Sequence, residues 1–150
     1  MTEEIIKFDL GDVELLSGEK LTSAVLVAKT WGRLSAARDN VIVLPTYYTG
    51  THEGYAPLVG PGNVFDTNRY FVVSPNLFGN GLSTSPSNAI DLNSGPRFPQ
   101  VDVYDNVLCQ HRLLTERFDV TDIQLVAGWS MGAIQAFHWA VAFPDLVRRI

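Results

Sequence analysis

Three short runs of almost entirely apolar residues constrain the fold of this chain more than any other feature. The runs are Val41-Ile42-Val43-Leu44, Tyr70-Phe71-Val72-Val73 and Ile123-Gln124-Leu125-Val126-Ala127. A strand with one face in water alternates apolar and polar side chains, whereas a strand that is covered on both faces is apolar throughout. Because helices cover both faces of a parallel sheet, the three runs predict parallel strands in the interior of a domain.

Residues 1–30 show a different pattern, an alternation of apolar and polar side chains. The alternation runs through Ile6–Leu10 and resumes in Val13–Leu15, with Gly11-Asp12 between them as turn residues. This pattern predicts an antiparallel hairpin at the start of the chain. A further strand is expected at 21–30 and ends near Gly32.

Two helices are expected between and after the interior strands. The clearer one begins near Asp102, a suitable N-cap, and its apolar side chains recur at Val103, Val107, Leu114 and Phe118. The second follows Ser130 and ends at about 143–145, where the sequence is Phe-Pro-Asp. Strands that alternate with helices predict an α/β sheet, which antiparallel strands precede here.

Two further segments bear on the extent of the domain. Residues 76–100 are rich in Gly, Ser, Asn and Pro, so we expect an irregular loop over the surface or over a site. Residues 146–150, LVRRI, resemble the approach to another strand. Residues 1–150 are therefore expected to be the N-terminal portion of a single, incomplete domain. Such a sheet would expose a pairing edge, so we expect the isolated chain to aggregate or to need a partner.

Composition limits the classes of partner. The net charge of −5 and the isoelectric point near 5.0 argue against binding to nucleic acids or anionic membranes, and favour a small-molecule substrate. Cys109 is the single cysteine, and the acidic residues near the N-terminus are unlike a secretory signal. No apolar run approaches the ~20 residues of a membrane span, and no metal site is suggested. A soluble, cytoplasmic protein is expected.

One pentapeptide carries the chemistry that the sequence indicates. Gly128-Trp129-Ser130-Met131-Gly132 fits G-x-S-x-G, in which a sharp turn from strand to helix holds a nucleophilic serine above the sheet. Glycines let the strand and the helix approach closely at this strained turn. The pattern alone also fits a glycine-rich junction with an incidental serine. Its context favours the nucleophile, because an apolar strand precedes it and residues at helical spacing follow.

A serine that accepts an acyl group also needs hydrogen-bond donors for the oxyanion that develops on the substrate. In this type of turn, one donor is the backbone N–H of the residue after the nucleophile, which is Met131 here. The second donor should come from the loop after an earlier strand. Residues 45–50, PTYYTG, directly follow the run at 41–44 and form such a loop, the oxyanion loop. The alternative is that its tyrosines serve only in packing.

Four segments resemble the homoserine O-acetyltransferase family of enzymes with the α/β-hydrolase fold. They are SGEKL at 17–21, RDNVIVLPTYYTGTH at 38–52, LVGPGNVFDTNRYFVVSPNLFG at 58–79 and GWSMGAIQAFHWAVAFPDLV at 128–147. The third is the most specific, since few other α/β-hydrolases combine Val-Gly-Pro-Gly with Phe-Asp-Thr-Asn-Arg-Tyr-Phe-Val-Val. The resemblance begins at about residue 15 and implies the N-terminal part of an α/β-hydrolase fold.

The resemblance implies a ping-pong acyl transfer. Ser130 would take an acyl group from a thioester such as acetyl-CoA and pass it to a small-molecule alcohol, with acyl-CoA as co-substrate and no bound cofactor. By alignment of the loop, Tyr48 supplies the second oxyanion N–H. The family's turn usually reads Gly-Gly-Ser-Met-Gly-Gly, whereas this chain has Trp129 before the serine and Ala133 after the second glycine. Relatives with this form are often described only as hydrolases, so an ester or lactone hydrolase is the alternative.

The remaining catalytic groups are expected outside residues 1–150. In this fold the acid and the histidine follow the serine in chain order, so a following part of the chain or a second polypeptide would supply them. A homodimer is left open, and no residue is singled out for substrate binding. His111 and His138 are expected to be structural or surface residues, whereas His52, near the oxyanion loop, could line the site. A hypothesis of another class is a non-catalytic ligand-binding or subunit module.

Overall fold

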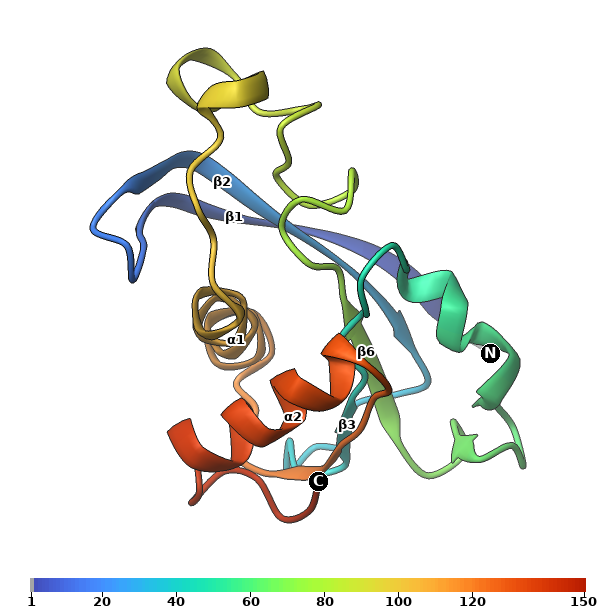
Figure 1. Ribbon diagram of the computed structural model, residues 1–150. Coiled ribbons are helices and arrows are strands. Elements are labelled where there is room, and N and C mark those ends of the chain that lie inside the picture. Colours follow the sequence, from blue (N-terminus) through green and yellow to red (C-terminus); the bar gives the residue numbers. More distant parts are fainter. Residues whose placement is uncertain (1) are drawn as a thin grey trace.

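A mixed five-stranded sheet forms the centre of the computed structural model, which describes residues 2–150 (Figure 1). In order across the sheet, its strands are β1 (Glu3–Glu14), β2 (Lys20–Trp31), β6 (Phe71–Pro75), β3 (Val41–Val43) and β7 (Ile123–Val126). The pairs β1–β2 and β2–β6 are antiparallel, and the pairs β6–β3 and β3–β7 are parallel. A separate ribbon pairs β4 (Val59–Gly60) with β5 (Phe65–Asp66).

Strand β3, which lies between β6 and β7, confirms the prediction from the apolar runs. Val41 lies opposite Phe71 of β6 on one side and opposite Ile123 of β7 on the other. All three residues of β3 are at most 3% exposed. Val41 and Val43 belong to one apolar cluster and Ile42 to another, because successive side chains of a strand point to opposite faces. Both faces are covered, so the strand carries no polar residue.

The predicted turn at Gly11-Asp12 is wrong. β1 continues through these residues and pairs with β2 on both sides of them. Gly11 has a φ of +65° and lies where the register shifts, as in a β-bulge. The inward side chains on either side of it, Leu10 and Val13, are three residues apart, because a bulge adds a residue without reversing the strand. The reversal instead comes at 15–19, where the chain turns into β2.

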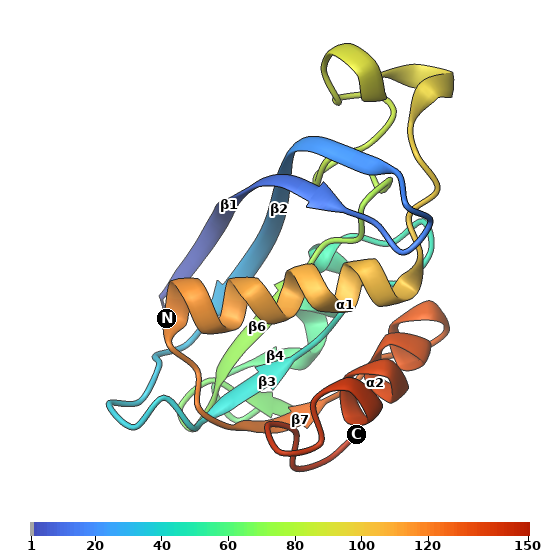
Figure 2. The same ribbon diagram turned by 90° about the vertical axis from the view of Figure 1, so that its left-hand side faces the viewer.

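Two helices cover one face of the sheet. α1 (Val103–Arg112) and α2 (Met131–Ala142) lie side by side on this face (Figure 2). The predicted N-cap of α1 is confirmed: Asp102 Oδ1 accepts from the Tyr104 N–H at 3.0 Å, and Asp105 Oδ2 accepts from the Asp102 N–H at 2.8 Å. A π-helical turn, η4 (Leu113–Arg117), continues α1 toward Phe118, the last of the predicted apolar positions.

The opposite face is covered by a segment that the sequence did not mark as structured. This segment begins with a 3-10 helix, η1 (His52–Leu58), and continues through β4 and β5. Its Tyr55 is 1% exposed and packs in the smaller apolar cluster with Ile42 and Leu44. The larger cluster lies under α1 and α2. The sheet is thus sandwiched, as a parallel arrangement requires.

Residues 76–100 form the predicted irregular loop, which contains two short 3-10 helices, η2 (Asp91–Asn93) and η3 (Gly95–Arg97). The first part of the loop satisfies backbone groups of β2. Ser83 Oγ accepts from the Val27 N–H at 3.0 Å, and Thr84 Oγ1 accepts from the Val25 N–H at 2.8 Å. Ser83 and Thr84 are both buried, so this part of the loop is packed into the domain.

Residues 146–150 run beside β7. Val147 forms a parallel bridge with Ile123, and the Ile123 N–H donates to the Leu146 carbonyl at 2.8 Å. The predicted approach to a further strand is present as this single bridge. Within residues 2–150, no helix is both long enough and apolar enough to cross a membrane.

Candidate active site

The sharp turn between β7 and α2 holds Ser130 at its apex. Ser130 has a φ of +53° and a ψ of −128°, a conformation that costs an L-residue on the order of 1–3 kcal/mol. A Cβ built on Gly128 would lie 2.6 Å from the Gly132 carbonyl carbon, and one on Gly132 would lie 2.7 Å from the Pro45 carbonyl oxygen. The two glycines therefore allow a close approach that a side chain at either position would block.

The Ser130 side chain is exposed, and its hydroxyl is not used by the fold. Ser130 is the N-cap of α2, yet its hydroxyl makes no capping hydrogen bond, which is unusual for a serine at that position. Its backbone carbonyl begins the helix by accepting from the N–H groups of Ala133 at 3.0 Å and Ile134 at 3.2 Å. Since nothing in residues 2–150 holds the hydroxyl by a hydrogen bond, Oγ can turn toward a substrate and toward a base.

Two backbone N–H groups, of Tyr48 and Met131, have no hydrogen-bond acceptor within the described part of the chain. Met131 is the first residue of α2, where N–H groups lack an intrahelical partner and the helix dipole favours negative charge. Tyr48 follows Tyr47 in a turn that the Gly50 N–H closes by donating to the Tyr47 carbonyl at 2.9 Å. The turn does not use the Tyr48 N–H, so both predicted donors are available for an oxyanion.

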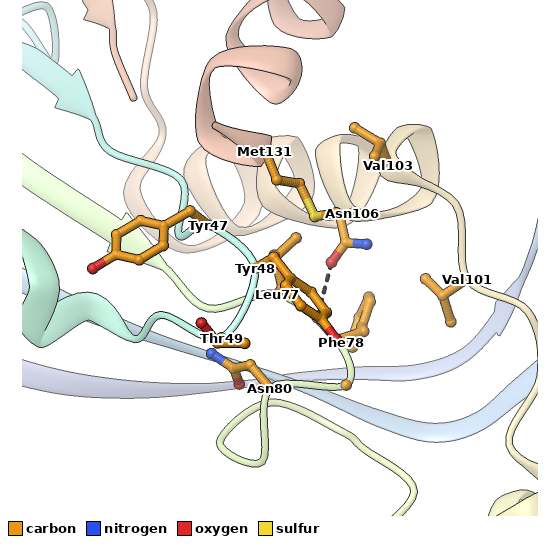
Figure 3. Close-up of a pocket in the computed structure, with 11 residues that line it drawn as sticks. Tyr47, Tyr48, Thr49, Leu77, Phe78, Asn80, Val101, Val103, Asn106 and Met131 are labelled. Carbon is orange, nitrogen blue, oxygen red and sulfur yellow. Dashed lines mark hydrogen bonds between the residues drawn. The ribbon is translucent and has the colours of Figure 1, made fainter. Parts of the chain in front are cut away.

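A cavity of about 430 Å³ opens beside this turn, and both donor residues line it (Figure 3). The other lining residues are Tyr47, Thr49, Leu77, Phe78, Gly79, Asn80, Val101, Val103 and Asn106. None of these side chains is charged. The Asn106 amide is already used, because its Oδ1 accepts from the Phe78 N–H at 2.9 Å and its Nδ2 donates to the Asp102 carbonyl at 3.0 Å. The cavity therefore suits an uncharged, partly apolar group.

Three aromatic rings pack together at the turn, those of Trp129, Tyr47 and Tyr55. The centroid of the Trp129 ring lies 4.7 Å from that of Tyr55 and 5.4 Å from that of Tyr47. The residue before the nucleophile is thus a packing partner of the oxyanion loop, although Trp129 remains 44% exposed. Tyr55 Oη donates to the Pro45 carbonyl at 2.8 Å, and burial raises the pKa of its phenol to about 12, so it stays protonated.

His52 does not line the cavity, contrary to the expectation from its position near the oxyanion loop. It is 7% exposed, and its Nδ1 lies 2.9 Å from Asn76 Nδ2. Its Nε2 lies 3.2 Å from Glu53 Oε1. Because the asparagine N–H donates, Nδ1 accepts and Nε2 carries the proton toward the carboxylate. Both ring nitrogens are engaged in holding the start of η1.

His111 and His138 lie on α1 and α2, as predicted. The His111 ring stacks on Phe143 with centroids 3.9 Å apart. Within residues 2–150, neither histidine forms a hydrogen bond with Ser130, and no group of three or more His, Cys, Asp or Glu side chains is arranged to hold a metal ion. Cys109 is buried, which raises the pKa of its thiol to about 12 and keeps it unreactive. The location of the base and the acid outside residues 1–150 stays a prediction.

Residues 39–150 match a family model described as the alpha/beta hydrolase fold. The chain is 40% identical over 142 residues to a probable esterase of Corynebacterium glutamicum, and 39% identical over 142 residues to an ethyl acetate hydrolase of Pseudomonas veronii. It is 34% identical over 152 residues to a homoserine O-acetyltransferase of Thermobifida fusca. These alignments cover 93%, 94% and 91% of this chain but only 41%, 41% and 40% of the relatives, so the chain spans about two fifths of their length.

A solved structure, that of the acetyl esterase MekB, has the same arrangement of elements. It superposes with a TM-score of 0.91 at 37% sequence identity, and the superposition covers 99% of this chain and 43% of that one.

Proposed function

This chain belongs to the alpha/beta hydrolase fold family, and we propose that it carries the nucleophile and both oxyanion donors of a hydrolase of small, uncharged esters. One observation carries the proposal: the exposed Ser130 hydroxyl, free of hydrogen bonds within the described chain, lies at the turn beside a cavity that Tyr48 and Met131 line. Their free N–H groups suit an oxyanion that forms next to the serine.

The proposed reaction begins when Ser130 Oγ attacks the ester carbonyl carbon and gives its proton to a histidine base. The carbonyl oxygen becomes an oxyanion, which accepts hydrogen bonds from the N–H groups of Tyr48 and Met131. The intermediate collapses, the alcohol leaves with the proton from the base, and the acyl group stays on Ser130. Water then attacks the acyl-enzyme and releases the acid. The histidine and its carboxylate partner follow Ser130 in the chain order of this fold.

The lining of the cavity supports a neutral substrate. Burying an unpaired charge is costly, and the described chain places no charged side chain on the lining that would offset this cost. Leu77, Phe78 and Val103 instead offer apolar contact to an acyl or alkyl group. The relatives named an ethyl acetate hydrolase and an acetyl esterase point to the same class of substrate.

A second candidate is transfer of the acyl group to an alcohol instead of water, with acyl-CoA as the donor. The 34% identity to a homoserine O-acetyltransferase favours it. The acyl-enzyme on Ser130 is common to both candidates. They differ in the acceptor, which is water in one and an alcohol in the other. Homoserine is an amino acid, and its charged groups would need charged partners, which residues 2–150 do not place on the cavity lining.

The test is acylation of the full-length protein. We expect intact-mass spectrometry after a short exposure to p-nitrophenyl acetate to show one added acetyl group, and we expect ethyl acetate to be hydrolysed. Ser130→Ala should remove the added mass and lower kcat/KM by at least about 10³-fold. The matched control is Ser87→Ala, which changes an exposed loop serine and should leave the added mass and kcat/KM unchanged.

The same preparation distinguishes the two acceptors. A hydrolase loses its acetyl group at the same rate with and without added homoserine, whereas a transferase loses it faster and forms O-acetylhomoserine. An unmodified wild-type protein, or a Ser130→Ala variant that is still acetylated and active, would contradict the proposal.

A further inference from the structure

Three polar side chains form a fully buried network between α1 and α2. They are Gln110 on α1, and Gln135 and Trp139 on α2, and each is 0% exposed. A buried amide that lacks hydrogen bonds is costly, so a protein retains two of them in an otherwise apolar interior only where they are bonded. The hydrogen-bond partners of these two glutamines therefore indicate their role.

The bonds run in one direction, from Trp139 to two backbone carbonyls. Trp139 Nε1 donates to Gln110 Oε1 at 3.0 Å, and Gln110 Nε2 donates to Gln135 Oε1 at 2.7 Å. Gln135 Nε2 then donates to the Thr46 carbonyl at 2.8 Å and to the Met131 carbonyl at 3.2 Å. A carbonyl can only accept, so the Thr46 and Met131 carbonyls determine how the Gln135 amide is turned, and the indole N–H of Trp139, which can only donate, does the same for Gln110.

The two carbonyls belong to the two segments that carry the oxyanion donors. Met131 supplies one free N–H and lies one turn before Gln135 on α2. Thr46 lies two residues before Tyr48, which supplies the other. The Gln135 amide therefore joins the oxyanion loop directly to the first turn of the helix that follows the nucleophile, across 89 residues of sequence.

The oxyanion loop is held at further points on the same stretch. The Thr46 N–H donates to the Pro75 carbonyl at 3.2 Å, and Thr46 Oγ1 accepts from the Leu77 N–H at 3.0 Å. These bonds tie Thr46 to the end of β6. The bond from Tyr55 Oη to the preceding carbonyl, that of Pro45, holds the loop from the other side of the sheet. Gln135 differs from these contacts because its side-chain amide joins the loop to the first turn of α2.

We propose that Gln135 is a positioning residue of the oxyanion hole: its amide sets the distance between the Tyr48 and Met131 N–H groups before a substrate binds. This inference rests on the proposed function. Donors that are already in place cost no reorganisation as charge develops, and a misplacement of about 1 Å can cost about 10²-fold in rate. Gln135 itself is buried away from the substrate and acts only through the two segments it joins.

The test compares two substitutions of the same chemistry in the full-length protein. Gln135→Met removes the donor to Thr46 and Met131, whereas Gln110→Met removes a buried amide of the same network and leaves the Gln135 donor in place. We expect Gln135→Met to lower kcat for p-nitrophenyl acetate by about 10- to 100-fold, with KM within about threefold of the wild-type value. We expect Gln110→Met to stay within about threefold in kcat, although it lowers the melting temperature comparably.

A second readout separates positioning from a general loss of structure. A trifluoromethyl ketone forms a tetrahedral adduct with a serine and presents an oxyanion, so its affinity should fall with kcat in Gln135→Met and not in Gln110→Met. If Gln135→Met does not fold, Gln135→Glu replaces it. A glutamic acid donates to Thr46 only while protonated, so the rate of this variant relative to wild type should fall as the pH rises.

Three results would overturn the inference. The first is an equal loss of kcat in Gln135→Met and Gln110→Met after correction for the folded fraction. The second, where Gln135→Glu is used, is a rate relative to wild type that does not depend on pH. Either result leaves the proposed function intact, provided that the wild-type protein is acetylated on Ser130. The third, absence of acetylation in the wild type, would overturn the proposed function and this inference together.

Discussion

Gly132→Ala tests the close approach of the nucleophile helix to the oxyanion loop. The added Cβ would lie 2.7 Å from the Pro45 carbonyl oxygen and 2.9 Å from Tyr55 Oη. Carbon and oxygen atoms in favourable contact are about 3.3 Å or more apart, so the loop and the helix must separate by about 0.6 Å. Neither neighbour can move easily, since one is backbone and the other is a buried phenol that is bonded to it.

The separation should affect stability and rate together. Overpacking of this kind costs about 1–3 kcal/mol in the free energy of unfolding. It also moves Tyr48 away from Met131, so we expect the burst of nitrophenolate released from p-nitrophenyl acetate to slow by at least about tenfold. Stopped-flow absorbance measures the burst, and urea unfolding followed by circular dichroism measures stability.

Gly62→Ala is the matched control. Gly62 has a φ of +73° and nothing within 4 Å of the added Cβ, so the substitution strains the backbone without crowding a neighbour. It should cost on the order of 1 kcal/mol and leave the burst rate unchanged. If Gly132→Ala had the stability and the burst rate of the wild type, the close approach at this turn, and the reasoning built on it, would be refuted.

Two further expectations concern groups away from the site. Cys109 should not react with iodoacetamide in the native protein at pH 8, because burial raises the pKa of its thiol to about 12; rapid labelling without unfolding, detected by mass spectrometry, would contradict this. Burial lowers the pKa of His111, so the folded state resists protonation of this side chain. The free energy of unfolding is therefore highest above the pKa of an unfolded histidine, about 6.5, and falls as the pH drops below it. We therefore expect His111→Phe to lose less stability than the wild type between about pH 7 and pH 5 in urea titrations, and an identical loss in both proteins would exclude this role.

Local chemistry made much of the fold predictable. The strand at 41–43, the N-cap Asp102 and the turn around Ser130 all depend on neighbours within a few residues. The error at Gly11 has a local cause as well. Glycine and aspartate suit both a turn and a bulge, and the three-residue spacing from Leu10 to Val13 was the signal that favoured the bulge.

The proposed oxyanion hole was predictable only in part. Met131 follows from the motif itself, and Tyr48 followed from the resemblance of its loop to a known family. His52 is close to this loop in sequence, but its bond to Asn76, 24 residues later, decides that it lies in the interior. Tyr55 was missed because nothing in its own segment indicates that its hydroxyl bonds to the Pro45 carbonyl.

By itself, the sequence determined the type of each main element and the identity of the candidate nucleophile, because apolar periodicity, caps and glycine positions act over a few residues. Only the tertiary structure decided that Tyr48 and Met131 share a cavity and that Gln135 joins their segments. A glutamine within an apolar helix has no local signature of its partner. The bond from Gln135 to Thr46 spans 89 residues, and it exists only after β3, β7 and the two helices have packed together.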